Sequence, residues 1–191
     1  MMKRPTADET QNKIRAALVA EAALKGIGST SVGGVAKRAG VSAGTIYLHF
    51  ESKEDLLQKS YLDIRAKFHG ILIAPSNEAD SKTMIYKMWF DLFDYIDDRP
   101  LDFLFSEYSG AAQVLTQQQV KIVKQYHAEI AALLQRAIDD DTLADLPLPT
   151  IATLLLGPAM YLARARAQGN VLITRDVLTL TFERVWLSIS Q

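Results

Sequence analysis

Three side chains that can exchange hydrogen bonds with a ligand, Thr45, Tyr47 and His49, alternate within a few residues of one another. Their hydroxyl and imidazole groups can both donate and accept, which suits recognition of a polar surface. Ile46 and Phe50 lie four residues apart in the same stretch and therefore share one face of a helix. The spacing predicts a short helix with an apolar inner face and a polar outer face.

A tight turn is predicted just before this helix. Gly40 can enter the left-handed conformation that ends a helix, because it has no Cβ. Ser42 can then cap the following helix by accepting hydrogen bonds from its free N–H groups. The segments 31–39 and 43–49 thus form two helices joined by a turn. This is the layout of a helix-turn-helix whose second helix enters the major groove of DNA.

The helices on either side complete a three-helix head and lead into the rest of the chain. Residues 10–25 carry an apolar stripe at helical spacing. A further helix starts at Ser52, where Asp55 stands at the spacing of a capping box, and runs to about His69. Lys53 in its first turn opposes the helix dipole, so a nearby phosphate would explain it. Later helices are predicted at 84–97, 101–109, 116–139, 150–168 and 174–190, with a loop at 70–81.

Residues for catalysis or metal binding do not form any familiar pattern. There are no cysteines, and the three histidines lie far apart. No glycine-rich phosphate loop or nucleophile elbow occurs, and the run 139–141 lacks the spacing of a calcium loop. The longest apolar run, 151–163, is too short to span a membrane, and residues 1–13 are polar. We therefore expect no enzyme activity, no cofactor, no metal and no membrane partner, and a cytoplasmic location.

Positive charge is concentrated in the first part of the chain. Residues 1–53 hold eight Lys or Arg against four Asp or Glu, whereas the whole chain has a net charge of −1. This distribution favours contact of the first part with a polyanion.

The run AGVSAGTIYLHFESKEDLL at residues 39–57 resembles the signature of the TetR family of transcriptional regulators, of the TetR/AcrR type. The resemblance implies an all-α protein of about nine helices. A three-helix helix-turn-helix DNA-binding domain would occupy residues 1–53, and a ligand-binding and dimerisation domain residues 54–191. Gly33 and Gly34 depart from the family pattern, which often has a charged or polar residue there.

The resemblance also assigns roles to individual residues of the head. Ala43, Gly44, Thr45, Leu48 and His49 would face base edges or the groove. Tyr47, Lys53 and Ser31 would hold phosphates. The predicted DNA-binding set is Ser31, Ser42, Ala43, Gly44, Thr45, Tyr47, Leu48, His49 and Lys53.

The last two helices, near 150–168 and 174–190, are apolar on more than one face. Such helices must be covered on both sides, and a second copy of the chain is a natural cover. The resemblance likewise implies a homodimer through these helices.

The middle helices concentrate aromatic side chains, which is compatible with ordinary core packing. In the family, however, an inducer pocket lies among these helices, and such pockets are apolar with a few polar groups. The predicted ligand-binding set is Trp89, Phe93, Phe103, Glu107, Tyr108, Tyr126 and His127.

The sequence therefore favours a ligand-responsive repressor. It would bind a palindromic double-stranded DNA operator as a homodimer and leave it when a small-molecule inducer binds. One alternative is the same DNA-binding dimer regulated by a protein partner without an inducer. The other is a helical enzyme of unrecognised type, which the missing acid, base and nucleophile patterns disfavour.

Overall fold

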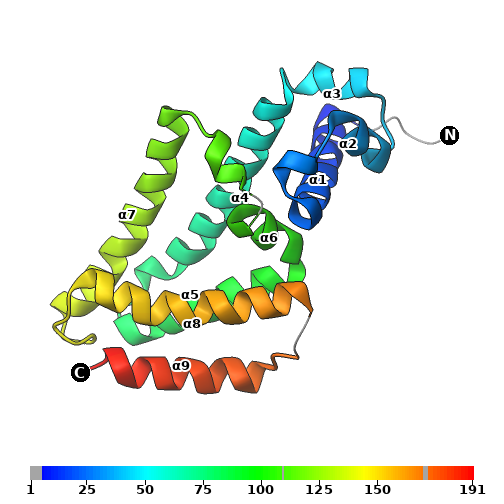
Figure 1. Ribbon diagram of the computed structural model, residues 1–191. Coiled ribbons are helices and arrows are strands. Elements are labelled where there is room, and N and C mark those ends of the chain that lie inside the picture. The colour runs from blue at the N-terminus through cyan, green and yellow to red at the C-terminus, as the bar shows by residue number, and fades with distance from the viewer. Residues whose placement is uncertain (1–5, 109, 170–171) are drawn as a thin grey trace. The chain divides into compact units, whose positions relative to one another are not determined.

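The computed structural model describes residues 6–108, 110–169 and 172–191, and the α-helix is their dominant element (Figure 1). The all-α prediction is confirmed. Within the described ranges the only strand-like pairing is an isolated bridge between Leu143 and Ser190. The α-helices are α1 (Ala7–Lys25), α2 (Val32–Ala39), α3 (Ala43–His49), α4 (Lys53–Ile73), α5 (Ser81–Asp98), α6 (Pro100–Tyr108), α7 (Gln117–Asp139), α8 (Leu148–Gln168) and α9 (Arg175–Ile189). Short 3₁₀ turns are η1 (Ile27–Ser29), η2 (Ala74–Asn77) and η3 (Ala111–Val114).

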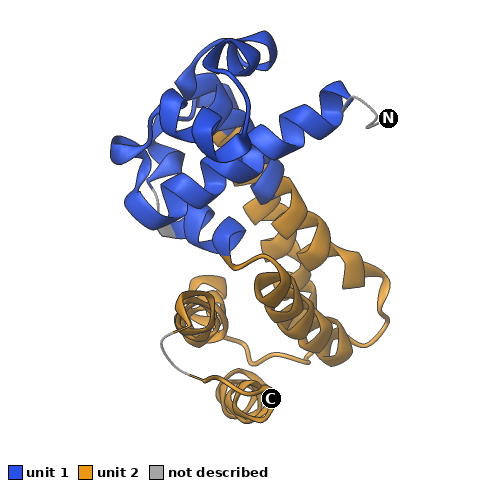
Figure 2. Ribbon diagram, turned by 90° about the vertical axis from the view of Figure 1, so that its right-hand side faces the viewer, with its two compact units in different colours: residues 1–65, 101–119 blue, residues 66–100, 120–191 orange. Residues whose placement is uncertain are grey.

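The chain forms two compact units, shown in Figure 2. Unit 1 contains residues 1–65 and 101–119, and unit 2 contains residues 66–100 and 120–191. Unit 1 therefore holds α1, α2 and α3 together with most of α4, nearly all of α6, and η3. Helix α4 begins in unit 1 and ends in unit 2.

The core of unit 1 is built from the apolar faces of its first helices. Ile14 and Leu18 of α1 are fully buried, as the stripe in the sequence predicts. Val35 from α2 and Ile46 from α3 are buried as well. Three short amphipathic helices thus share one interior.

Three helix boundaries differ from the prediction by three or more residues. Helix α5 begins at Ser81 rather than at residue 84, because Asp80 caps it by accepting from the N–H of Thr83. Helix α1 begins at Ala7 rather than at residue 10, because Thr6 and Glu9 form a reciprocal capping box. Helix α4 continues to Ile73, so the predicted loop at 70–81 is wrong over its first four residues. Gly70 does not break the helix, since a helical glycine costs only about 1 kcal/mol relative to alanine.

Unit 2 is organised around helix α5, which packs against α8, while α8 and α9 lie side by side (Figure 1). Phe182 of α9 makes edge-on or tilted ring contacts with Trp89 and Phe90 of α5. The guanidinium of Arg166 in α8 binds both Asp97 of α5 and the carbonyl of Ile173, which precedes α9. Aromatic packing and this arginine together tie the three helices into one body.

Helix α8 alone among the helices that the structure describes is long and apolar enough to cross a membrane by length and composition. Its inner face, including Ile151, Leu155 and Ala159, is buried in unit 2, and Pro158 interrupts its backbone hydrogen bonds.

Candidate nucleic-acid interface and interior cavity

The turn between α2 and α3 has the geometry predicted from its residues. Gly40 is in the left-handed region, with φ of 63° and ψ of 38°. The N–H of Val41 donates to the carbonyl of Ala36 at 3.0 Å, which closes the end of α2. The Oγ of Ser42 then accepts a hydrogen bond from the N–H of Thr45 at 3.0 Å. Gly40 ends α2 and Ser42 starts α3, so the angle between the two helices is set by adjacent residues.

Helix α3 presents a sharply divided surface. Ile46 is 1% exposed and Leu48, two residues on, is 84% exposed. Tyr47 is 55% exposed beside it, and Ala43 and Gly44 at the start of the helix are exposed as well. The buried side anchors α3 in unit 1, and the opposite side is available to a partner.

Thr45 and Ser42 are linked through their hydroxyl groups, which lie 2.9 Å apart. Because the Ser42 oxygen also accepts from the backbone of Thr45, the two side chains hold each other at the start of α3. His49, at the other end of α3, is half-buried and its ring lies 6.5 Å from that of Phe50. The hydroxyl of Thr45 is thus held at the start of α3, and the imidazole of His49 lies at its end.

Two residues predicted to hold phosphates lie on neighbouring elements. The Nζ of Lys53 donates to the carbonyl oxygen of Ile27 at 3.1 Å, and this bond ties the start of α4 to η1. An ammonium group has two further N–H donors for an anion. The Oγ of Ser31 accepts from the N–H of Gly34 at 3.0 Å, while its own O–H is still able to donate.

Helix α2 is held against α1 by a buried carboxylate. Glu21 is only 9% exposed and lies 3.0 Å from Lys25 and 3.6 Å from Arg38 of α2. The hydrogen bond from Lys25, with help from the charge of Arg38, lowers the pKa of Glu21 below its ordinary value. The carboxylate therefore stays ionised at neutral pH. A Cβ on Gly34 would come within 3.5 Å of its oxygen.

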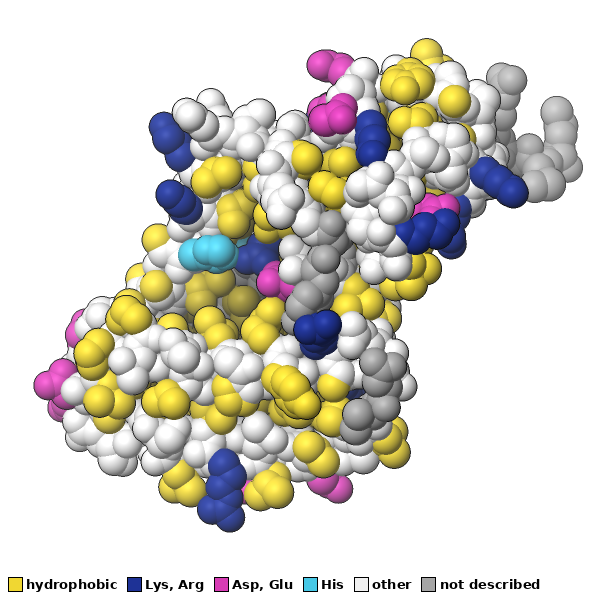
Figure 3. All heavy atoms as spheres, viewed as in Figure 1, with side chains coloured by type: hydrophobic (Ala, Val, Ile, Leu, Met, Phe, Trp, Pro, Cys, Tyr) yellow, Lys and Arg dark blue, Asp and Glu magenta, His cyan; other side chains and the backbone are white. Residues whose placement is uncertain are grey.

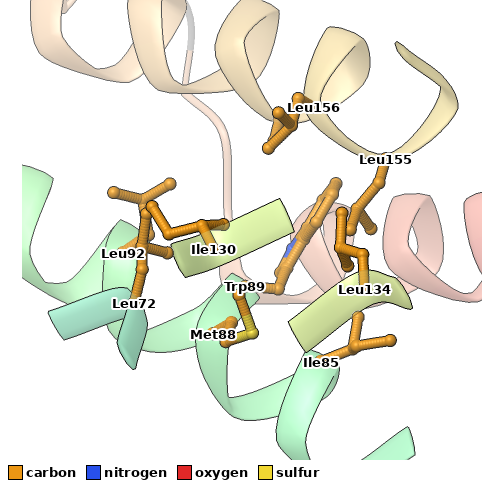
Figure 4. Close-up of a pocket in the computed structure, with 10 residues that line it drawn as sticks. Leu72, Ile85, Met88, Trp89, Leu92, Ile130, Leu134, Leu155 and Leu156 are labelled. Atoms are coloured by element: carbon orange, nitrogen blue, oxygen red, sulfur yellow. The ribbon is translucent and has the colours of Figure 1, made fainter. Parts of the chain in front are cut away.

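Unit 2 contains a cavity of about 40 Å³ among α4, α5, α7 and α8 (Figure 4). Every lining side chain is apolar apart from the indole nitrogen of Trp89. The cavity is lined by Leu72, Ile85, Met88, Trp89, Leu92, Ile130, Leu134, Leu155, Leu156 and Ala159.

Of the predicted ligand-binding residues, Trp89 lines this cavity and Phe93 is buried nearby on the same helix. Tyr126 is half-buried on α7 and stacks on His69, with 4.3 Å between ring centres. The neighbouring His127 is exposed. These four residues belong to unit 2, but only the first contributes to the cavity wall.

The other predicted ligand-binding residues lie on α6, in unit 1. Phe103 is buried there. Glu107 accepts a hydrogen bond from Arg65 at 2.6 Å, so its charge is already balanced within that unit. The side chain of Tyr108 lies outside the described residues.

Sequence reasoning missed the aliphatic lining residues. It favoured aromatic and polar side chains as ligand contacts, whereas the walls are mostly leucine, isoleucine and methionine. These residues follow the same helical spacing as any core residue, so nothing in the pattern marks them. In the described part of the chain, no group of three or more acidic or histidine side chains is placed to bind a metal ion.

Helices α8 and α9 carry large apolar side chains on their outer surface. Figure 3 shows apolar side chains distributed over this region of unit 2. Tyr161 is 75% exposed on α8, and Leu180 is 53% exposed on α9. The exposed apolar set on the two helices is Leu154, Leu156, Tyr161, Val177, Leu180 and Leu187.

Comparison with family models matches both parts of the chain. The model described as "Bacterial regulatory proteins, tetR family" matches residues 14–59. The model described as "Tetracyclin repressor-like, C-terminal domain" matches residues 83–190, more than half of the chain. A curated relative, the HTH-type transcriptional regulator AcrR of Shigella flexneri, is 36% identical over 75 residues. That match spans 34% of this chain and 35% of the relative's length.

Solved structures share the fold over nearly the whole length. A TetR family transcription regulator from Marinobacter aquaeolei VT8 has a TM-score of 0.84 at 24% identity, covering 96% of this chain and 97% of that one. A tetR family regulatory protein from Rhodococcus RHA1 has a TM-score of 0.81 at 16% identity, covering 95% and 97%. The fatty acid degradation regulator FadR from Bacillus halodurans has a TM-score of 0.73 at 19% identity, covering 98% and 95%.

Proposed function

The chain belongs to the TetR family of DNA-binding transcriptional regulators, and we propose that it is a homodimeric repressor that a small-molecule inducer releases from a palindromic operator. The observation that carries the proposal is the division of α3, where Ile46 is buried and Leu48 is almost fully exposed. A helix anchored on one side and open on the other is what insertion into a major groove requires.

The side chains of α3 limit how the bases are read. Residues 43–49 contain no Arg, Lys, Asn or Gln, which are the side chains that most often bond guanine or adenine in the major groove. Direct reading therefore falls to the hydroxyl of Thr45, the imidazole of His49 and apolar contact by Leu48. A leucine in the groove suits the methyl group of thymine.

Contacts to the DNA backbone would come from residues around α3. Tyr47 has an exposed hydroxyl-bearing ring, and Lys53 and Ser31 have donors to spare. Such contacts position the protein without reading sequence, and they weaken as salt concentration rises.

Homodimerisation would bury the outer surface of α8 and α9. Side chains as large as Tyr161 and Leu180 exposed on adjacent helices are typical of a protein–protein interface. A two-fold interface would present two copies of α3 to half-sites about one DNA turn apart, roughly 34–36 Å.

Release by an inducer would follow from linkage. If the DNA-free dimer binds the inducer more tightly than the DNA-bound dimer does, the inducer must weaken operator binding by the same factor. The apolar cavity around Trp89 supports a ligand in unit 2. Its modest volume is the observation that favours the alternative, in which a protein partner regulates the dimer. In this proposal the chain catalyses no reaction. It acts in the cytoplasm.

Selection of bound sequences from random double-stranded DNA by the purified chain tests the proposal. We expect a motif with two-fold symmetry whose half-sites are about one helical turn apart. Enrichment of an unsymmetrical motif, or no enrichment, would contradict a homodimer on a palindromic operator. A metabolite extract that lowers affinity for the selected DNA would support the inducer, whereas release only by a protein fraction would favour the alternative.

A further inference from the structure

We propose that the cavity of unit 2 binds an uncharged, apolar group that carries one hydrogen-bond acceptor, and that the indole N–H of Trp89 donates to this acceptor. The inference rests on the proposed function, since it gives the chemical class of the inducer. It follows from the lining of the cavity, from the state of Trp89 and from the cavity volume.

Among the side chains that line the cavity, that of Trp89 carries the one nitrogen or oxygen atom, its indole Nε1. Trp89 is 4% exposed, and in the described part of the chain no group accepts a hydrogen bond from its Nε1. Figure 4 shows the edge of the ring that carries Nε1 turned toward the side of the cavity where Ile130 and Leu92 lie. A buried donor without a partner is unfavourable, and a ligand oxygen beside it would remove that cost.

The ring of Trp89 is held in this orientation by its other neighbours. Phe182 of α9 packs edge-on against it, with ring centres 5.5 Å apart, and Phe93 packs at 5.6 Å. Aromatic rings therefore occupy one side of the indole, while Nε1 is buried and has no hydrogen-bond partner among the described residues, so a ligand oxygen reaches it only when a neighbouring lining side chain moves. A donor fixed before binding loses little conformational freedom when the ligand arrives.

The lining excludes a charged group. None of the ten lining side chains is ionisable, and transfer of an unpaired charge into such a site is strongly unfavourable. Glu107, the one carboxylate in the predicted ligand-binding set, is on α6 in unit 1 and already binds Arg65. The acceptor is therefore a neutral oxygen, such as that of a ketone, ester or amide.

The volume limits what enters without rearrangement. About 40 Å³ corresponds to roughly three water-sized atoms, which accommodates an acetyl group but not a large ring system. Met88, with three rotatable bonds, and Leu156, 41% exposed, are the lining residues that can most easily move for a longer alkyl chain. The proposed ligand is therefore a short carbonyl head on an apolar tail.

Nuclear magnetic resonance of the indole N–H groups tests this directly, because the chain has only two tryptophans. The probe is 2-hexanone, and the comparison compounds are hexanoate and hexylammonium, which have tails of similar length. We expect 2-hexanone to shift the Trp89 N–H signal saturably and to leave the Trp186 signal in place. No saturable shift with 2-hexanone, or an equal shift with either ion, would overturn the proposal.

Two variants, with one control, test separately the hydrogen bond from Trp89 and the volume of the cavity. Trp89→Phe keeps an aromatic ring and removes the donor, and we expect 2-hexanone to bind at least fivefold more weakly, as measured by competition or calorimetry. Trp186→Phe is the matched control and should bind 2-hexanone as the natural chain does. Ala159→Val fills part of the cavity while keeping Trp89, so it should abolish the shift. Retention of the shift in Ala159→Val would place the ligand elsewhere.

The outcome is distinguishable from failure of the proposed function. If 2-hexanone binds at Trp89 without changing affinity for the selected operator, the cavity chemistry stands and the inducer role fails. If a charged compound releases the operator and leaves the Trp89 signal unchanged, the regulator stands and the present inference is wrong.

Discussion

The ammonium nitrogen of Lys53 lies 3.1 Å from the carbonyl oxygen of Ile27, so the first turn of α4 is bonded to the turn that follows α1. Sequence patterns predict a phosphate contact for this lysine and give no sign of this second role. The side chain is therefore placed by the fold before any DNA arrives, which lowers the entropy cost of an ion pair with phosphate.

Replacement of Lys53 by alanine should weaken binding to all DNA sequences alike. Because one phosphate contact is lost, the slope of log affinity against log salt should fall by about 0.9. Fluorescence anisotropy at several salt concentrations measures both effects. Lys59→Ala is the control, since Lys59 pairs with Asp55 at 2.8 Å and has no predicted DNA contact. An unchanged slope in Lys53→Ala would contradict the phosphate contact.

If Leu48 contacts a thymine, the affinity of the protein for its operator should depend on the methyl group of that thymine. In the selected operator, we expect substitution of deoxyuridine for one thymidine in each half-site to weaken binding about fifteenfold, the effect of two buried methyl groups. Leu48→Ala should bind the two DNAs equally. Leu24→Ala, which alters another exposed leucine of unit 1, should still prefer thymidine. Equal binding of both DNAs by the natural chain would show that Leu48 reads no methyl group.

A charge on the outer surface of α9 should separate the proposed dimer. Leu180 is 53% exposed in the single chain, and burial of an unpaired carboxylate at an interface is strongly unfavourable. We expect Leu180→Glu to sediment as a monomer in analytical ultracentrifugation and to bind the operator far more weakly. Leu24→Glu should leave the oligomeric state unchanged. A dimeric Leu180→Glu protein would argue for an interface elsewhere.

The two adjacent glycines of α2 should respond differently to alanine. No atom lies within 4 Å of a Cβ built on Gly33, so Gly33→Ala should raise the free energy of unfolding by up to about 1 kcal/mol. A Cβ on Gly34 would be 3.2 Å from the Oγ of Ser31, which caps the helix. We therefore expect Gly34→Ala to gain less or to lose stability. Urea unfolding of both variants measures the difference, and equal gains would contradict it.

Stability should fall as the solution is acidified below about pH 4.5, the ordinary pKa of a glutamate. Hydrogen bonds from Lys25 to Glu21, from Thr83 to Asp80 and from Ser81 to Asp140 lower the pKa of each carboxyl group in the folded chain. Protonation then favours the unfolded chain, whose carboxyl groups bind protons at higher pH. Urea unfolding at pH 7 and below pH 4.5 should show the loss. Asp80→Asn should reduce the pH dependence, and an unaltered dependence would show that Asp80 contributes little.

The local part of this structure was predictable from sequence. Gly40 and Ser42 set the turn and the start of α3 through their own backbone and hydroxyl groups, so a few adjacent residues carried the signal. The start of α1 was missed because the Thr6–Glu9 capping box precedes the apolar stripe used to find the helix. Helix α4 was ended too early because Gly70 reads as a break, although the apolar residues after it continue the helix.

Contacts between distant segments were not predictable in this way. The side chain of Gln58 donates to the carbonyl of Val114 at 2.7 Å, which joins α4 to η3 within unit 1. Neither residue belongs to a motif, and nothing in their spacing indicates the contact. The cavity is a second case, since its existence depends on how side chains from four helices fill a space together. DNA contacts, dimer contacts and the predicted boundary between residues 53 and 54 stay predictions.

The contrast between Ile46 and Leu48 has a consequence for how such a protein changes over evolutionary time. A substitution at the 84%-exposed position 48 alters the surface offered to DNA while leaving the buried anchor of α3 intact. Surface changes of this kind usually alter stability by no more than about 0.5 kcal/mol. Single substitutions at position 48 can therefore change operator preference while the chain stays folded. A substitution at position 46 would disturb the buried side of α3 and lower stability.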